Sequence, residues 1–228
     1  MVPWVHLDST IMPGGGELRL MRRGTEFSIM AGAIELMNSR VSGSEKALAV
    51  LACGRIASRP QARVLIGGLG MGFTLRATLG VLGTDARVVV AELVPKVVEW
   101  ARGPMAALFE SCLDDPRVGI HQADVGEQLR PGGERYDAIM LDVDNGPEGL
   151  TRKANDALYD ARGLGAAYAT LRPGGVLAVW SSRPDRGFTE RLRQARFAVE
   201  EVRARASGGR GARHVIWLAT RPEAGRNK

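Results

Sequence analysis

Short apolar runs alternate with amphipathic stretches along most of the chain. Five runs have the length and apolar character of buried strands, at 62–66, 86–92, 117–121, 136–142 and 176–180. Helical periodicity predicts five helices around them, at 44–52 with Ser44 as N-cap, 72–82, 95–109, 155–171 and 189–195. Strands that alternate with helices form a parallel sheet covered on both faces.

The two ends of the chain depart from this alternation. Apolar runs at 197–203 and 214–220 have no helix between them, which predicts an antiparallel pair at one edge of the sheet. Glycines and short alternating stretches in residues 1–43 predict a small β-hairpin. We therefore expect an α/β fold: a doubly wound, seven-stranded Rossmann-like sheet, mostly parallel with an antiparallel edge hairpin. Residues 1–43 would form a β-rich appendage and residues 44–228 the catalytic domain.

Composition narrows the function classes. The net charge of +6 is concentrated in residues 183–228, which hold 12 basic and 5 acidic residues. Only three aromatic residues, Phe188, Phe197 and Trp217, accompany these arginines, so we interpret them as a solvated surface and do not expect a nucleic-acid partner. Two cysteines and three histidines favour neither a disulfide framework nor a metal site. The chain has no apolar run of membrane-spanning length and no signal-peptide pattern, so we expect a cytoplasmic protein without a membrane partner.

A glycine-rich stretch follows the first predicted core strand. It reads Gly67-Gly-Leu-Gly-Met-Gly72, with the spacing Gly68-x-Gly70-x-Gly72. The dinucleotide fingerprint needs its third glycine one place later, and a P-loop needs Lys-Ser/Thr. The shorter spacing is seen in nucleoside-binding S-adenosylmethionine enzymes, although a plain strand–helix turn also explains it. In doubly wound sheets, ligands bind beyond the carboxyl ends of the strands, where this loop should lie.

Acidic residues end the next two predicted strands. Glu92 ends an apolar run, where a charged residue is unusual unless it has a functional role. We therefore predict that Glu92 and the adjacent Leu93 bind a ribose. Asp124 and Val125 follow the third strand, where the carboxylate and the next N–H could contact an adenine. Asp124 is equally well explained as a helix N-cap.

A pair of carboxylates follows the fourth strand. Asp142 directly follows a buried run and is our candidate for the group that binds the acceptor and takes its proton. Asp144 is a second catalytic candidate and Asn145 a substrate-binding one, although this stretch also has the composition of an ordinary turn.

In their order and spacing, these motifs resemble the spermidine synthase family of aminopropyltransferases, which are S-adenosylmethionine-type transferases. The resemblance rests on the glycine loop and on five further segments, at 91–99, 114–118, 122–124, 136–142 and 171–177. It implies that Glu92 holds the ribose, Asp124 the adenine amine and Asp142 the acceptor amine. It also implies a homodimer. Residues 33–40 resemble the start of that family's core domain, and we add Glu35 and Tyr159 as substrate-binding candidates.

The chain also departs from the family. The family's glycine loop has an aspartate where this chain has Gly70, its early Tyr-His-Glu is replaced at 44–46, and its acidic strand-four motif is shortened. Fewer carboxylates favour S-adenosylmethionine as the cofactor, without metal, and methyl transfer to a small-molecule acceptor. Two alternatives remain open. One is aminopropyl transfer from decarboxylated S-adenosylmethionine, and the other is a non-catalytic adenosyl- or nucleic-acid-binding protein.

Overall fold

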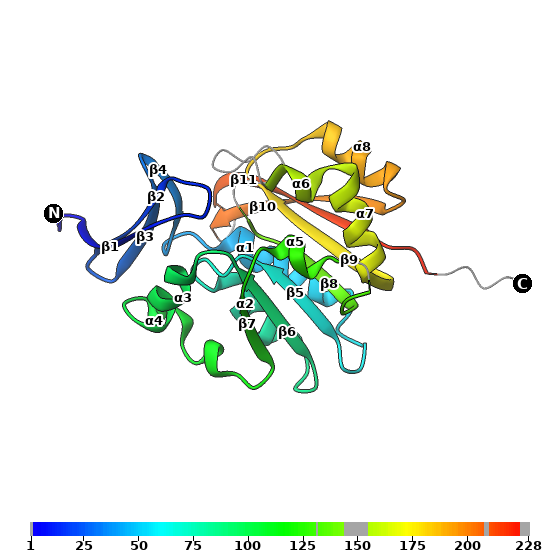
Figure 1. Ribbon diagram of the computed structural model, residues 1–228, viewed down its shortest axis with the longest axis horizontal. Coiled ribbons are helices and arrows are strands. Elements are labelled where there is room, and N and C mark those ends of the chain that lie inside the picture. Colours follow the sequence, from blue (N-terminus) through cyan, green and yellow to red (C-terminus); the bar gives the residue numbers. More distant parts are fainter. Residues whose placement is uncertain (1, 131, 144–154, 208–209, 224–228) are drawn as a thin grey trace, which may run out of the picture.

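The computed structural model describes residues 2–130, 132–143, 155–207 and 210–223. It contains two sheets (Figure 1). The small N-terminal sheet is an antiparallel meander of β1 (Val5–Ile11), β2 (Glu17–Arg23), β3 (Glu26–Ala31) and β4 (Ile34–Asn38). The appendage is therefore a four-stranded sheet rather than the predicted hairpin.

The large sheet has seven strands in the order β10-β11-β9-β8-β5-β6-β7. Its strands are β5 (Arg63–Gly67), β6 (Arg87–Glu92), β7 (Val118–Gln122), β8 (Tyr136–Leu141), β9 (Leu171–Ser181), β10 (Ala198–Ser207) and β11 (Arg210–Thr220). The pairs from β7 across to β9 are parallel, whereas β11 runs antiparallel to both β9 and β10. The predicted doubly wound sheet with an antiparallel edge hairpin is confirmed, and its order reverses between β5 and β8.

Helices cover both faces of the large sheet. The helical segments are α1 (Gly43–Gly54), α2 (Phe73–Val81), α3 (Pro95–Arg102), α4 (Ala106–Phe109), the short 3-10 helix η1 (Cys112–Asp114), α5 (Val125–Gln128), α6 (Asp156–Tyr159), α7 (Ala161–Thr170) and α8 (Arg186–Gln194). One core joins α1, α2 and α3 to the sheet, and a second joins α5, α6, α7 and α8 to the opposite face. Among the described residues, no helix combines the length and apolar character that crossing a membrane requires.

Several helices differ from the predicted ones: the stretch 155–171 forms two helices, α6 and α7, and α8 begins three residues earlier than predicted. Helix α1 begins at Gly43 with Ser42 in the N-cap position, so Ser44 lies inside the first turn, where its hydroxyl donates to Glu45. The predicted helix at 95–109 is split because Gly103 ends α3, and its N–H bonds back to the carbonyl of Glu99 at 2.9 Å.

The small sheet is attached to the large domain by both apolar and polar contacts. Leu18, Leu20, Phe27 and Ile29 are buried in the same core as α1 and α3. The indole Nε1 of Trp100 in α3 donates to Asp8 in β1 at 2.9 Å. The meander therefore lies against the edge of the large sheet where the parallel strands end (Figure 1).

At the opposite end of β8, a buried aspartate holds three segments together. Asp137 accepts hydrogen bonds from Arg59 at 2.8 Å, from Arg172 at 2.9 Å and from the backbone N–H of Arg63 at 2.8 Å. Its side chain is only 1% exposed, so the two arginines neutralise a charge that water does not reach.

We expect Asp137→Ala to destabilise the fold by roughly 3 kcal/mol, because it leaves two arginines and an N–H without their acceptor. Urea unfolding followed by circular dichroism measures this. The matched control is Glu134→Gln, which breaks the exposed pair with Arg63 and should change stability little. Equal unfolding midpoints for the two variants would contradict the structural role of Asp137.

Candidate active site

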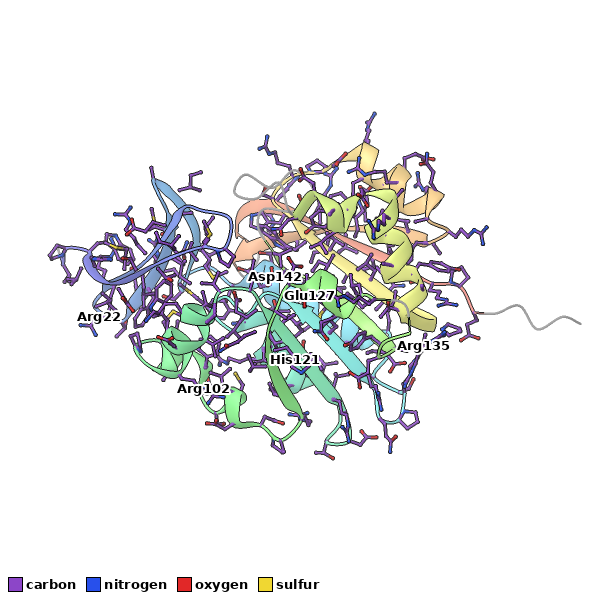
Figure 2. The ribbon with its side chains drawn as sticks, in the orientation of Figure 1. Arg22, Arg102, His121, Glu127, Arg135 and Asp142 are labelled. Carbon is purple, nitrogen blue, oxygen red and sulfur yellow. The ribbon has the colours of Figure 1, made fainter. Side chains whose placement is uncertain are left out.

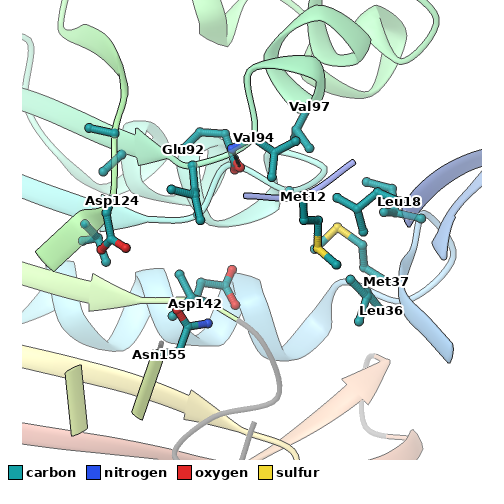
Figure 3. Close-up of a pocket in the computed structure, with 18 residues that line it drawn as sticks. Met12, Leu18, Leu36, Met37, Glu92, Val94, Val97, Asp124, Asp142 and Asn155 are labelled. Atoms are coloured by element: carbon teal, nitrogen blue, oxygen red, sulfur yellow. Dashed lines mark hydrogen bonds between the residues drawn. The ribbon is translucent and has the colours of Figure 1, made fainter. Parts of the chain in front are cut away.

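A pocket of about 150 Å³ lies where the strands of the large sheet end and face the small sheet (Figure 3). The large sheet and its loops contribute polar groups, and the small sheet contributes an apolar wall. Its lining consists of Met12, Leu18, Ile29, Leu36, Met37, Gly68, Gly70, Ala91, Glu92, Leu93, Val94, Val97, Ala123, Asp124, Val125, Asp142, Val143 and Asn155. Figure 2 places Asp142 in the middle of the molecule, away from the arginines labelled at its periphery.

Backbone hydrogen bonds tie together the three strand ends that carry the acids. The N–H of Gly68 donates to Ala91 at 2.9 Å, and that of Asp142 donates to Gly67 at 3.1 Å. The N–H of Ala123 donates to the carbonyl of Glu92 at 3.0 Å. These bonds continue the parallel ladder by one residue, so Glu92, Asp124 and Asp142 converge on one cavity.

The two loop glycines that line the pocket have left-handed backbone conformations that favour glycine. Gly68 has φ of +89°, and a Cβ there would lie 2.7 Å from the carbonyl oxygen of Asp142. At Gly70, with φ of +50°, a Cβ would lie 2.6 Å from Cε of Met37. Met37 of the small sheet thus occupies the space into which a side chain at position 70 would point. Gly67 ends β5, and Gly72 stands at the N-cap position of α2.

Glu92 is buried and accepts from two backbone groups. Its Oε2 accepts the N–H of Leu69 at 2.8 Å, and its Oε1 accepts the N–H of Val94 at 2.9 Å. Burial raises the pKa of this carboxyl, and the backbone donors act against that rise. The backbone groups of Gly70 and Leu93 also act on this carboxyl, so the glycine loop and the end of β6 fix it at the pocket.

Asp124 caps α5 with its Oδ1, which accepts the N–H of Gly126 at 2.8 Å. The N-cap explanation is therefore confirmed. Because Ala123, Asp124 and Val125 also line the pocket, capping does not remove this carboxyl from the site.

Asp142 is half-buried at the pocket wall and accepts from Oγ1 of Thr74 at 2.6 Å. Burial raises the pKa of Asp142 to about 7, and the negative charge of Glu45 adds to this, while the Thr74 hydrogen bond opposes it. A carboxyl that titrates near neutrality can take up and release a proton at physiological pH.

The structure does not bring every predicted residue to the pocket. Glu35 is not among the lining residues, and it accepts from Ser28 at 2.7 Å and Asn38 at 3.0 Å within the small sheet. Tyr159 is buried in the core, with its ring edge-on to Phe188 at 5.6 Å, and does not line the pocket either. The lining of the pocket therefore does not support either substrate-binding assignment, and both stay predictions. Asp144 and Asn145 lie outside the described residues.

The sequence analysis missed the apolar wall and one polar residue. Leu36 and Met37 come from β4 of the small sheet, and Met12 comes from the connection between β1 and β2. Asn155 lies beside Asp142 (Figure 3). A signal for Met37 was present, since it falls within residues 33–40, which already resembled a known domain start. Nothing in the local pattern around Met12 or Asn155 indicates a pocket. Among the described residues, no group of three or more His, Cys, Asp or Glu side chains is arranged to hold a metal ion.

Sequence comparisons point to one enzyme class. The chain is 33% identical over 129 residues to polyamine aminopropyltransferase 1 of Streptomyces coelicolor, covering 56% of this chain and 23% of that protein. It is 35% identical over 92 residues to a polyamine aminopropyltransferase of Pyrobaculum calidifontis, covering 39% of this chain and 32% of that protein. The match thus spans less than a third of these curated relatives. A scan against protein-family models finds no match.

Structure comparisons agree on the fold. Spermidine synthase from Thermotoga maritima aligns with a TM-score of 0.72 and 20% identity, covering 96% of this chain and 74% of that one. A spermidine synthase bound to the transition-state analogue AdoDATO also scores 0.72, at 19% identity, with 96% and 73% covered. Human methyltransferase-like protein 13 with SAH scores 0.56 at 19% identity, with 81% of each chain covered.

These findings contradict our prediction of methyl transfer and favour the aminopropyltransferase alternative, because the sequence relatives carry that name. The prediction rested on the absence of an acidic residue at position 70. The pocket is nevertheless negatively charged without that residue. Three carboxylates still line the pocket, and Met37 fills the space beside Gly70. The chain therefore has a spermidine synthase-like fold and shares sequence with polyamine aminopropyltransferases over about half of its length.

Proposed function

We propose that this protein transfers an aminopropyl group from decarboxylated S-adenosylmethionine to an amine. The observation that carries the proposal is the charge of the pocket. Its described lining includes the carboxyl groups of Glu92, Asp124 and Asp142, and it includes no lysine or arginine. Decarboxylated S-adenosylmethionine carries a sulfonium and an ammonium and no carboxylate. The full compound would place its α-carboxylate among these acids without a cation to pair it.

The residues present fit the nucleoside part of this donor. Glu92 lines the pocket with a carboxyl group, an acceptor that suits the two ribose hydroxyls. Asp124 and the N–H of Val125 suit the amine and a ring nitrogen of adenine. The glycine loop lets a ligand approach the backbone between these two acids. The methionine-rich wall of the small sheet covers the apolar part of the aminopropyl chain and excludes water.

In this proposal Asp142 is the catalytic base. It takes one proton from the acceptor ammonium, which frees the nitrogen lone pair. The nitrogen forms a bond to the aminopropyl carbon next to sulfur. The carbon–sulfur bond breaks with its electron pair going to sulfur, which leaves a neutral thioether and a secondary ammonium. The chain's contribution is to orient the two reactants, to exclude water and to hold the proton on Asp142.

Titration calorimetry with both donors tests the proposal. The decarboxylated donor should bind at least about tenfold more tightly than S-adenosylmethionine, because only the latter carries the unpaired carboxylate. 5′-Methylthioadenosine, which has neither charge, is the control for the nucleoside contacts. Incubation with diamines and mass spectrometry should then detect methylthioadenosine and an aminopropylated amine. Tighter binding of the carboxylated compound, or no aminopropylated product, would contradict the proposal.

A further inference from the structure

A chain of hydrogen bonds connects β11 to the first turn of α1, behind the wall that carries Asp142. Nδ1 of His214 lies 2.9 Å from Oγ of Ser44, and this hydroxyl donates to Oε2 of Glu45 at 2.7 Å. Because the single hydroxyl hydrogen goes to Glu45, Nδ1 of His214 must carry a hydrogen and donate to Ser44. Ser44 is fully buried, so water does not compete for the middle of the chain.

A threonine of α2 joins this chain to the site. Oγ1 of Thr74 donates to Oδ2 of Asp142 at 2.6 Å and also lies 3.4 Å from the backbone oxygen of Glu45. The first turn of α1 is therefore packed against the candidate base. The charge of Glu45 acts on Asp142, and it is the second cause, after burial, that raises the pKa of Asp142.

The other charged groups around this pair do not cancel the effect of Glu45. Across the pocket, Asp142 faces the acids Glu92 and Asp124. The ammonium of Lys46, next in sequence to Glu45, lies over the ring of Phe73, 5.9 Å from its centroid. Burial lowers the pKa of His214, although Glu45 opposes this, so the imidazole is neutral at neutral pH. It therefore donates a hydrogen bond without adding a positive charge.

We propose that His214, Ser44 and Glu45 form a positioning network that holds a second negative charge beside Asp142 and so strengthens Asp142 as the proton acceptor. The proposal rests on the proposed function for its role in catalysis, whereas the electrostatic coupling itself exists in the free protein. Glu45 acts through Asp142 rather than on the substrate, since Glu45 is not part of the pocket lining. The neutral imidazole of β11 sets the side-chain geometry from 170 residues away in the sequence.

Carboxyl NMR of the ligand-free protein tests the coupling without any turnover. The titration midpoint of Asp142 should fall by about one pH unit in Glu45→Gln, because a neutral amide of the same size no longer opposes ionisation. Glu190→Gln is the matched control, since Glu190 lies on the exposed face of α8 beside Arg193. An Asp142 midpoint that is the same in wild type and in Glu45→Gln would overturn the proposal.

Two substitutions at His214 separate positioning from packing. His214→Asn retains an N–H donor near the place of Nδ1 and should keep the wild-type midpoint of Asp142. His214→Leu retains bulk against Trp180 but has no donor, so the Ser44 hydroxyl is no longer fixed in the orientation that donates to Glu45, and the midpoint should fall. Identical midpoints in these two variants would overturn the assignment of His214. In the active protein, the acid limb of the kcat/KM profile should move to lower pH in Glu45→Gln, by the same amount as the NMR midpoint. Failure of aminopropyl transfer in wild type would refute the proposed function and leave the NMR result standing.

Discussion

Replacing Asp142 by asparagine is expected to reduce turnover about 10³-fold while leaving donor binding nearly unchanged. The amide has the same size and still accepts the hydrogen bond from Thr74, so the wall of the pocket keeps its shape. What it loses is the ability to take the acceptor's proton. Initial rates from quenched samples, with donor affinity by calorimetry, measure the two effects separately.

The pH dependence provides a second readout for the same residue. Because burial and Glu45 raise the pKa of Asp142 to about 7, kcat/KM in the wild type should decrease as pH falls below about 7. This limb should be absent from the residual activity of Asp142→Asn. Asp114→Asn, at an exposed aspartate, is the control and should keep the wild-type profile. Near-normal turnover by Asp142→Asn would show that the reacting centre lies elsewhere.

The raised pKa of Asp142 also has a cost in stability. Between the unfolded value near 3.8 and the folded value near 7, the folded state binds more protons than the unfolded state. Stability contributed by this group is therefore complete below pH 3.8 and is lost as pH rises through 7. If Asp142 is the base that we propose, it weakens the fold at the pH where it acts, which is a common trade between activity and stability.

The parallel core was predictable because its signal is local. Buried strands such as β5 and β8 are continuous apolar runs, and the acids Glu92 and Asp142 interrupt that pattern at strand ends. Because parallel strands of a doubly wound sheet end at the same side of the sheet, both acids are expected at the carboxyl ends of the strands. Two of the three carboxylates of the pocket follow from this reasoning, and the third, Asp124, follows from its place after β7.

Elements that depend on distant pairing were not predictable. Residues 172–175 have the composition of a turn, yet they belong to β9. The reason is that Gly174 and Gly175 exchange backbone hydrogen bonds with Arg221, both at 2.8 Å. Likewise, the sequence of β4 resembles the start of the core domain of the spermidine synthase family. In the structure, β4 pairs with β3 and places Met37 against Gly70. Neither the contact with Arg221 nor the contact between Met37 and Gly70 can be predicted from local composition, because each joins residues that lie far apart in the chain or in separate sheets.

The same limit applies to the network behind Asp142. Ser44 looks like a helix cap in the sequence, and His214 is one residue of an edge strand. Only the folding of β11 against α1 brings the two within 2.9 Å. The candidate catalytic carboxyl of Asp142 could thus be predicted from its local sequence. The network behind it could not, because Ser44 and His214 lie 170 residues apart in the chain.

Substituting Glu92 should have the largest effect on donor affinity. Each oxygen of this buried carboxyl group already accepts one backbone N–H, and in the proposed function the carboxyl also accepts from the ribose hydroxyls. In Glu92→Gln, one oxygen becomes an NH₂ group that faces the N–H of Leu69 or Val94. The variant therefore loses a ligand contact and also places two donors against each other, which costs the full penalty of unsatisfied buried groups. We expect donor binding to weaken at least about 100-fold, which corresponds to roughly 2.7 kcal/mol.

The choice of ligands separates loss of the ribose contacts from general damage to the loop. Calorimetry with decarboxylated S-adenosylmethionine and with 5′-methylthioadenosine should show equal losses for Glu92→Gln, since both compounds carry the same ribose. Glu99→Gln, at an exposed acid of α3 that pairs with Lys96, is the control and should bind both as the wild type does. A 2′,3′-dideoxy analogue should bind the wild type and Glu92→Gln with similar weak affinity, because the contact in question is already absent. If Glu92→Gln instead bound methylthioadenosine normally, Glu92 would be a loop-supporting residue alone, and the ribose would have to bind elsewhere in the pocket.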